Sequence, residues 1–166
     1  MAAMSEELLN ALSNEMAIYK KLQEHANEKT ECLVKNNMDK VKEITDREQI
    51  LLQELGKLEK VRMDIVESLK DIFGDPNLTL SKIAQRLPSE ERKRFVDLKI
   101  SIVDVLEKLK ETNRQNEMLI KEGLNITEYT LNAIQTQGNR MQNNSYGNEV
   151  GYGQGRNLPR YFEYRS

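Results

Sequence analysis

The sequence predicts an all-α protein, in which an antiparallel hairpin of two long helices packs with a third long helix as a three-helix coiled-coil-like bundle. One short helix and a disordered C-terminal tail complete the predicted chain. Apolar residues recur at steps of three and four, the period of one helical face, over most of the 166 residues. A composition of 31% charged and 5% aromatic residues, without tryptophan, suits long helices joined by thin aliphatic seams.

The first predicted helix begins near Ser5, whose hydroxyl is suited to cap it, with Glu6 and Glu7 placed against the positive end of the helix dipole. One apolar face follows and ends before Asn36-Asn37, which interrupt the period. The members of this face are Leu9, Leu12, Met16, Tyr19, Leu22, Ala26 and Leu33.

The second helix follows Asp39 and has the clearest periodicity in the chain. It ends at Gly74-Asp75-Pro76-Asn77, a helix stop and a turn. Two polar residues, Glu48 and Arg62, occupy positions of the otherwise apolar seam. They either reach the solvent at the edge of the seam or pair with a neighbouring helix, or they fix the register or the choice of partner. The apolar members are Val41, Ile44, Leu51, Leu55, Leu58, Ile65, Leu69 and Ile72.

A short helical segment over Leu78 to Leu87 closes at Pro88, and the third long helix starts at Ser89. Gly123 weakens its helix propensity locally, so that a bend or a fraying point is expected there. Two asparagines in the seam, Asn113 and Asn116, are candidates for fixing its alignment. The whole seam is Phe95, Leu98, Ile102, Leu106, Leu109, Asn113, Asn116, Ile120 and Leu124, continuing to Leu131 and Ile134.

The third helix is longer than the second, about 72 Å against about 52 Å at 1.5 Å per residue. Its end therefore extends past the hairpin from roughly Met118 to Ile134. Apolar residues on an uncovered helix need a partner, so that we expect this overhang to bind a substrate. The expected binding residues are Met118, Leu119, Ile120, Leu124, Leu131 and Ile134.

Residues 1–137 form the predicted helical domain, and residues 138–166 form a glycine- and tyrosine-rich tail without helical period. The tail holds five of the eight glycines and four of the six tyrosines, with too few aliphatic residues to bury a core. It is either low-complexity sequence without a role or a linear docking element.

No catalytic chemistry is expected. Phosphate-binding loops, dinucleotide-binding loops and nucleophile elbows are missing from the sequence, and no cofactor is expected. His25 and Cys32 are too few ligands for a structural zinc site, so that no metal is expected. A net charge of −2 favours neither nucleic acid nor membrane surfaces. No apolar run is long enough to insert in a membrane and the start does not look like a secretory signal, so that the expected location is the cytoplasm.

The order of the seam residues resembles the FlgN family of flagellar export chaperones. The resemblance rests on Met38-Asp39, Val41, Ile44, Glu48, Leu51-Leu52, Leu55, Leu58-Glu59 and Arg62, and on Leu106, Leu109, Asn113, Asn116 and Leu119-Ile120. Leu12, Tyr19, Leu22 and Leu33 also fit, so that the resemblance covers roughly residues 5–137.

This resemblance implies a cytoplasmic chaperone of the flagellar type III secretion system, which is not an enzyme. Its implied partners are the hook-associated proteins of the hook–filament junction, bound through C-terminal helical segments, and the flagellar export gate. The chaperone prevents premature assembly of these proteins and delivers them to the gate. A Tyr-Gly element of the family implies that Tyr146-Gly147 or Tyr152-Gly153 docks at the gate. The alternative function is a structural or scaffolding coiled-coil protein that acts through self-association.

Overall fold

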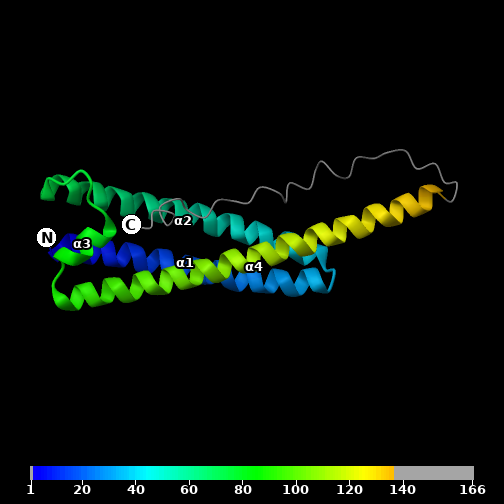
Figure 1. Ribbon diagram of the computed structural model, residues 1–166, viewed down its shortest axis with the longest axis horizontal. Helices are drawn as coiled ribbons and strands as arrows, with labels where there is room; N and C mark the ends of the chain where they lie inside the picture. The colour runs from blue at the N-terminus through cyan, green and yellow to red at the C-terminus, as the bar shows by residue number, and fades with distance from the viewer. Residues whose placement is uncertain (1, 137–166) are drawn as a thin grey trace.

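The computed structural model describes residues 2–136, except for the side chains of residues 2, 125–130 and 134–136. That part of the chain contains four helices and no strand (Figure 1). The predicted all-α fold is therefore confirmed. The helices are α1 (Ala2–Val34), α2 (Met38–Phe73), α3 (Leu80–Arg86) and α4 (Ser89–Thr136).

Helix α1 lies between the other two long helices. It packs closely against α2 and against α4, whereas the backbones of α2 and α4 approach each other hardly anywhere. The predicted hairpin is present, since α2 runs antiparallel to α1 after a tight turn, and α4 runs parallel to α1 (Figure 1). The core is thus formed on two sides of one central helix.

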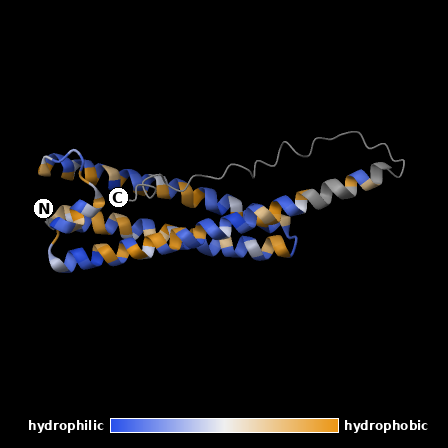
Figure 2. Ribbon diagram, viewed as in Figure 1, coloured by the Kyte–Doolittle hydropathy of each residue, from blue (hydrophilic) through white to orange (hydrophobic). Residues whose placement is uncertain are grey.

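The sequence of α1 explains this central position. Leu8, Tyr19 and Ala26 are completely buried, and Ala11 and Ile18 are also buried although they lie outside the face predicted from the sequence. Residues 8, 11, 15, 18 and 22 recur at steps of three and four beside the predicted stripe, which gives α1 a second packing side. Hydrophobic residues recur along the full length of the hairpin (Figure 2).

Ser5 does not cap α1. The helix begins at Ala2, so that Ser5 lies inside its first turns, and its Oγ donates a hydrogen bond to Oε2 of Glu91 on α4 at 2.8 Å. A serine within a helix needs a partner for its hydroxyl when it is buried. The expected cap is therefore a link between α1 and α4.

Helix α2 buries most of the predicted seam, including Val41, Ile44, Leu55 and Leu69. Ile72 is an exception, with 54% of its surface exposed. A straight helix drifts about 20° per heptad against a strict seven-residue repeat, so that the last residues of a long seam leave the core. Gly74 ends the helix in the left-handed conformation (φ +61°), as its lack of a side chain permits.

Helix α3 covers one end of the core. The Thr79 side chain caps it by accepting a hydrogen bond from the backbone N–H of Lys82. Ile83 and Ala84 are buried in the same cluster as the seams of the long helices. The Arg86 guanidinium lies 4.6 Å from the centre of the Phe73 ring and so ties α3 to the end of α2.

The two polar members of the α2 seam pair with α1. Arg62 Nε lies 2.9 Å from Glu15 Oε1, with side chains 4% and 0% exposed, and Glu48 Oε2 lies 2.5 Å from Lys29 Nζ. Of the readings left open by the sequence, pairing with a neighbouring helix is confirmed. In two antiparallel helices, the residue numbers of facing residues have a constant sum. This sum is the same for residues 15 and 62 as for residues 29 and 48, so that both ion pairs belong to one antiparallel alignment of α1 and α2.

A second carboxylate lies beside the buried pair. The pKa of Glu59 is raised, first by burial and then by repulsion from Glu15, while the Arg62 guanidinium opposes the rise. One guanidinium thus faces two acids at this level of the hairpin. Arg62 is therefore the group on which the charge balance of the level depends.

Replacing Leu55 by Asp should lower the free energy of unfolding by more than about 3 kcal/mol, since a charge replaces a side chain that is 2% exposed. Urea unfolding followed by circular dichroism measures the change. The control is Lys60→Asp at an exposed position of the same helix, which should change stability by less than about 0.5 kcal/mol. Equal midpoints for Leu55→Asp and wild type would contradict the seam.

Replacing Arg62 alone by Met should destabilise the protein by about 3–5 kcal/mol, because the carboxylate of Glu15 then stays buried without its guanidinium. Adding Glu15→Leu to this variant should recover most of the loss. A double-mutant cycle in urea measures both effects. If the double variant were less stable than Arg62→Met, the pair would not be the main interaction of either residue.

Candidate functional site

The candidate site is the part of α4 that extends beyond α1. Three hydrogen bonds align the two helices, and they join residues 86, 89 and 86 positions apart: Ser5 with Glu91, Gln23 with Thr112, and Thr30 with Asn116. With this offset, the end of α1 at Val34 lies level with residues 120–123 of α4 (34 + 86 and 34 + 89). Helix α4 continues to Thr136 and passes the α1–α2 turn (Figure 1). We call residues 118–136 the overhang.

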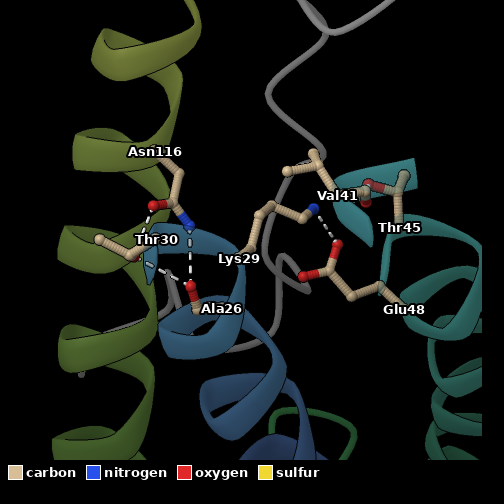
Figure 3. A network of polar contacts seen from close by, with 7 residues as sticks. All are labelled: Ala26, Lys29, Thr30, Val41, Thr45, Glu48 and Asn116. Carbon is tan, nitrogen blue, oxygen red and sulfur yellow. Dashed lines mark hydrogen bonds and ion pairs between the residues drawn. The ribbon is translucent and has the colours of Figure 1, made fainter. Parts of the chain in front are cut away.

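A layer of polar contacts lies at the base of the overhang (Figure 3). The buried Asn116 side chain donates from Nδ2 to the backbone carbonyl of Ala26 at 2.9 Å, and its Oδ1 accepts from the Thr30 hydroxyl at 2.5 Å. On the other side of α1, Lys29 reaches Glu48 of α2. This layer connects all three long helices at one level and fixes where α4 leaves the core.

The two seam asparagines of α4 differ. Asn116 is 3% exposed and hydrogen-bonded, as a residue that fixes alignment should be, whereas Asn113 is exposed. A register role is therefore supported for Asn116 alone. The neighbouring Thr112 takes the place expected for Asn113, since its hydroxyl accepts a hydrogen bond from Gln23 Nε2 at 3.0 Å.

Apolar side chains of the overhang are open to solvent. Leu124 is 43% exposed and Leu131 is 38% exposed, while Leu119 and Ile120 are half-buried. Ile134 belongs to α4, but its side chain lies outside the described part. The overhang thus presents aliphatic surface that nothing in the described chain covers completely.

Ile120, Leu124 and Leu131 continue the face with which α4 packs on α1. Leu109, Asn116 and Ile120 lie on that face, and Leu124 and Leu131 follow at steps of four and seven. The surface exposed on the overhang is therefore of the same kind as the surface that binds α1 further down the helix. A second helix placed in line with α1 would find the same seam.

Met118 lies on a different side of α4. It is two residues from Ile120, about 200° around the helix, and 47% exposed. Its sulfur accepts a hydrogen bond from Arg114 Nη1 at 3.1 Å. Arg114 is held in turn by Glu111, whose pKa it lowers through that hydrogen bond. The structure therefore does not bring Met118 together with the other predicted binding residues.

Two exposed apolar residues at the α1–α2 turn were missed by the sequence analysis. Val34 is 70% exposed and Met38 is 44% exposed, and they flank the turn at Asn36, which has a positive φ of 55°. Val34 follows Thr30 by one helical turn, on the side of α1 that faces α4. Their position beside the predicted turn, outside the periodic seam, is the signal that could have identified them.

The predicted docking residues Tyr146, Gly147, Tyr152 and Gly153 lie outside the described residues. Within the described chain, a shallow hollow of about 360 Å³ lies between α1 and α4 near their N-terminal ends, against Leu9, Arg94 and Asp97. No group of three or more His, Cys, Asp or Glu in that part of the protein is arranged to hold a metal ion. None of its helices is both long and apolar enough to span a bilayer.

Comparison with known proteins gives one match. Residues 1–152 match the model of a family described as FlgN protein. Searches of curated proteins and of solved structures give no match. The matched segment includes the whole of the described helices, contains Tyr146-Gly147 and ends at Tyr152.

Proposed function

The chain belongs to the FlgN family of flagellar export chaperones, and from this premise we propose that it binds hook-associated proteins of the hook–filament junction in the cytoplasm. It keeps these proteins from assembling before export and delivers them to the flagellar export gate. The function consists of binding and release, without catalysis and without a cofactor.

The observation that supports the binding site is the continued seam of the overhang. Ile120, Leu124 and Leu131 extend the face that binds α1. Helix α1 ends level with Ile120 and does not reach Leu124 or Leu131. A cargo helix bound there would lie end to end with α1 and pack on α4 in the same way. Residues at i, i+3, i+4 and i+7 of an amphipathic cargo segment are the expected contacts.

The exposed turn residues extend this surface. Val34 lies at the end of α1, where an incoming helix would meet the hairpin, and Met38 follows across the turn. Methionine adapts to different apolar shapes, which suits a site that accepts more than one cargo. The cargo would therefore touch the overhang and the end of the hairpin at once.

The size of the surface suits a chaperone that must release its cargo. Leu124 and Leu131 are each less than half exposed, and Leu119 and Ile120 are partly covered already. A few partly exposed aliphatic residues give a smaller gain on binding than a complete core seam would. Binding through the overhang is thus compatible with delivery and release.

Docking at the export gate is assigned in this proposal to a tyrosine of the tail. A tyrosine offers a large apolar ring with a polar end at modest entropic cost. The family match contains Tyr146-Gly147 completely but stops at Tyr152, before Gly153. This difference favours Tyr146 over Tyr152 as the docking residue.

The double variant Leu124→Glu with Leu131→Glu should weaken binding of the C-terminal segment of a hook-associated protein at least tenfold, because two charges replace the apolar contacts. Isothermal titration calorimetry measures the affinity, and circular dichroism should show unchanged helicity.

The matched control is Val96→Glu with Ile100→Glu, which alters two exposed aliphatic residues of the same helix at its other end. This control should bind cargo with wild-type affinity. If the overhang variant also kept wild-type affinity, the cargo site would lie elsewhere on the protein.

Removing residues 138–166 should leave cargo affinity within twofold of wild type but reduce recruitment to the gate and slow export. Tyr146→Ala in the full chain should reproduce most of this loss, and Tyr161→Ala, beyond the family match, should not. Pull-down with the export-gate component and the export rate in cells are the measurements. Full-rate export by the truncated chain would remove the docking role from the tail.

A further inference from the structure

Helix α2 has an apolar stripe outside the core. Ile50, Val61 and Ile72 are 59%, 51% and 54% exposed, although they are large and aliphatic. They are eleven residues apart, and eleven residues make just over three complete turns, so that all three lie on one side of α2. Leu58 and Ile65 lie between this stripe and the core and are only half-buried. The stripe is about 33 Å long.

The stripe is symmetric about Val61. Ile50 and Ile72 lie eleven residues before and after it, and the two polar residues within the stripe, Glu54 and Ser68, lie seven before and after it. A two-fold interface between identical chains requires that residue i meets residue j and residue j meets residue i. Two antiparallel α2 helices crossing at Val61 fulfil this condition along the whole stripe.

We propose that this face of α2 binds α2 of a second copy of the chain in antiparallel orientation. Val61 then meets Val61 of the second copy on the two-fold axis, and Ile50 meets Ile72 at each end. Glu54 lies opposite Ser68. The Ser68 hydroxyl donates to the backbone carbonyl of Asp64 at 3.0 Å in the single chain, and in the pair it would turn to donate to the Glu54 carboxylate of the second copy instead.

Charges at the edge of the stripe favour the same orientation. Lys57 and Asp64 are seven residues apart and so lie on the same edge of the stripe. In the antiparallel pair, Lys57 of each copy faces Asp64 of the other, whereas a parallel pair would place these edges of the two helices on opposite sides and leave both charges without a partner. Neither side chain has an ion-pair partner among the side chains that the structure describes. The charges therefore select an antiparallel second copy.

The interface leaves the overhang open. The stripe lies on α2, whereas the overhang belongs to α4 and projects beyond the start of α2 (Figure 1). In the antiparallel pair the two overhangs point in opposite directions. The inference is independent of the proposed cargo site, since it concerns the chaperone alone.

Sedimentation velocity of the full chain between about 1 and 100 μM should show a reversible monomer–dimer equilibrium. Val61→Glu should shift its midpoint to at least tenfold higher concentration, since it places two acids together on the two-fold axis. At concentrations where both proteins are monomers, it should leave the thermal midpoint unchanged. The matched control is Met63→Glu, which is 60% exposed and about 200° around the same helix. It should leave the equilibrium unchanged.

A monomer at all concentrations, or equal weakening by Val61→Glu and Met63→Glu, would overturn the interface. A charge exchange tests the orientation. Lys57→Asp should weaken the dimer at low salt by opposing two acids, and adding Asp64→Lys should restore it. In a parallel pair, residues 57 and 64 of the two copies would not face each other, so that neither Lys57→Asp nor the added Asp64→Lys would bring like charges together. Wild-type dimerisation by Lys57→Asp would therefore overturn the antiparallel arrangement.

Discussion

Helix α1 holds the molecule together, because it is the one long helix that packs against both others. Its buried residues cover about half of its circumference. By helical spacing, Ala11, Ile18 and Leu22 share the side of Glu15, which pairs with α2, and Leu9 and Met16 share the side of Gln23 and Thr30, which bond to α4. Since α2 and α4 hardly approach each other, each depends on α1 for most of its buried surface. This arrangement also explains the open surfaces, since α2 and α4 each keep a side that no third helix covers.

Buried polar groups fix how these surfaces are aligned. The Glu15–Arg62 pair determines the alignment of α2 on α1, and Asn116 with Thr30 determines the alignment of α4. An apolar seam alone tolerates a shift by one heptad, but such a shift would leave a charge or an amide buried without its partner. The position at which α4 leaves the core, and with it the length of the overhang, therefore depends on these few contacts.

Much of the fold could be predicted from the sequence, because long periodic seams and strong stop signals are local features. The ends of α2 and α4, the short helix α3 and the hairpin followed directly from them. The second side of α1 could not, since Glu15 looks like a surface residue until Arg62 is placed beside it. For the candidate site, helix length predicted the overhang, but not that Met118 lies on another side of α4 than Leu124 and Leu131, nor that Val34 is exposed beside it. Both points concern the direction of a side chain relative to a neighbouring helix, which the sequence of one helix does not specify.

The parallel arrangement of α1 and α4 has a consequence for the order of folding. Contacts of α1 with α2 join residues as few as 12 and 19 positions apart near the turn, whereas its contacts with α4 join residues 86–90 positions apart. Closing a longer loop costs more entropy and slows the formation of its contacts. During synthesis, the α1–α2 hairpin can form as soon as it emerges from the ribosome, while the α4-facing side of α1 stays bare until about residue 116 has followed. The nascent chain thus passes through a stage in which Leu9 and Met16 are unprotected, and the speed of translation through α3 and α4 sets how long that stage lasts.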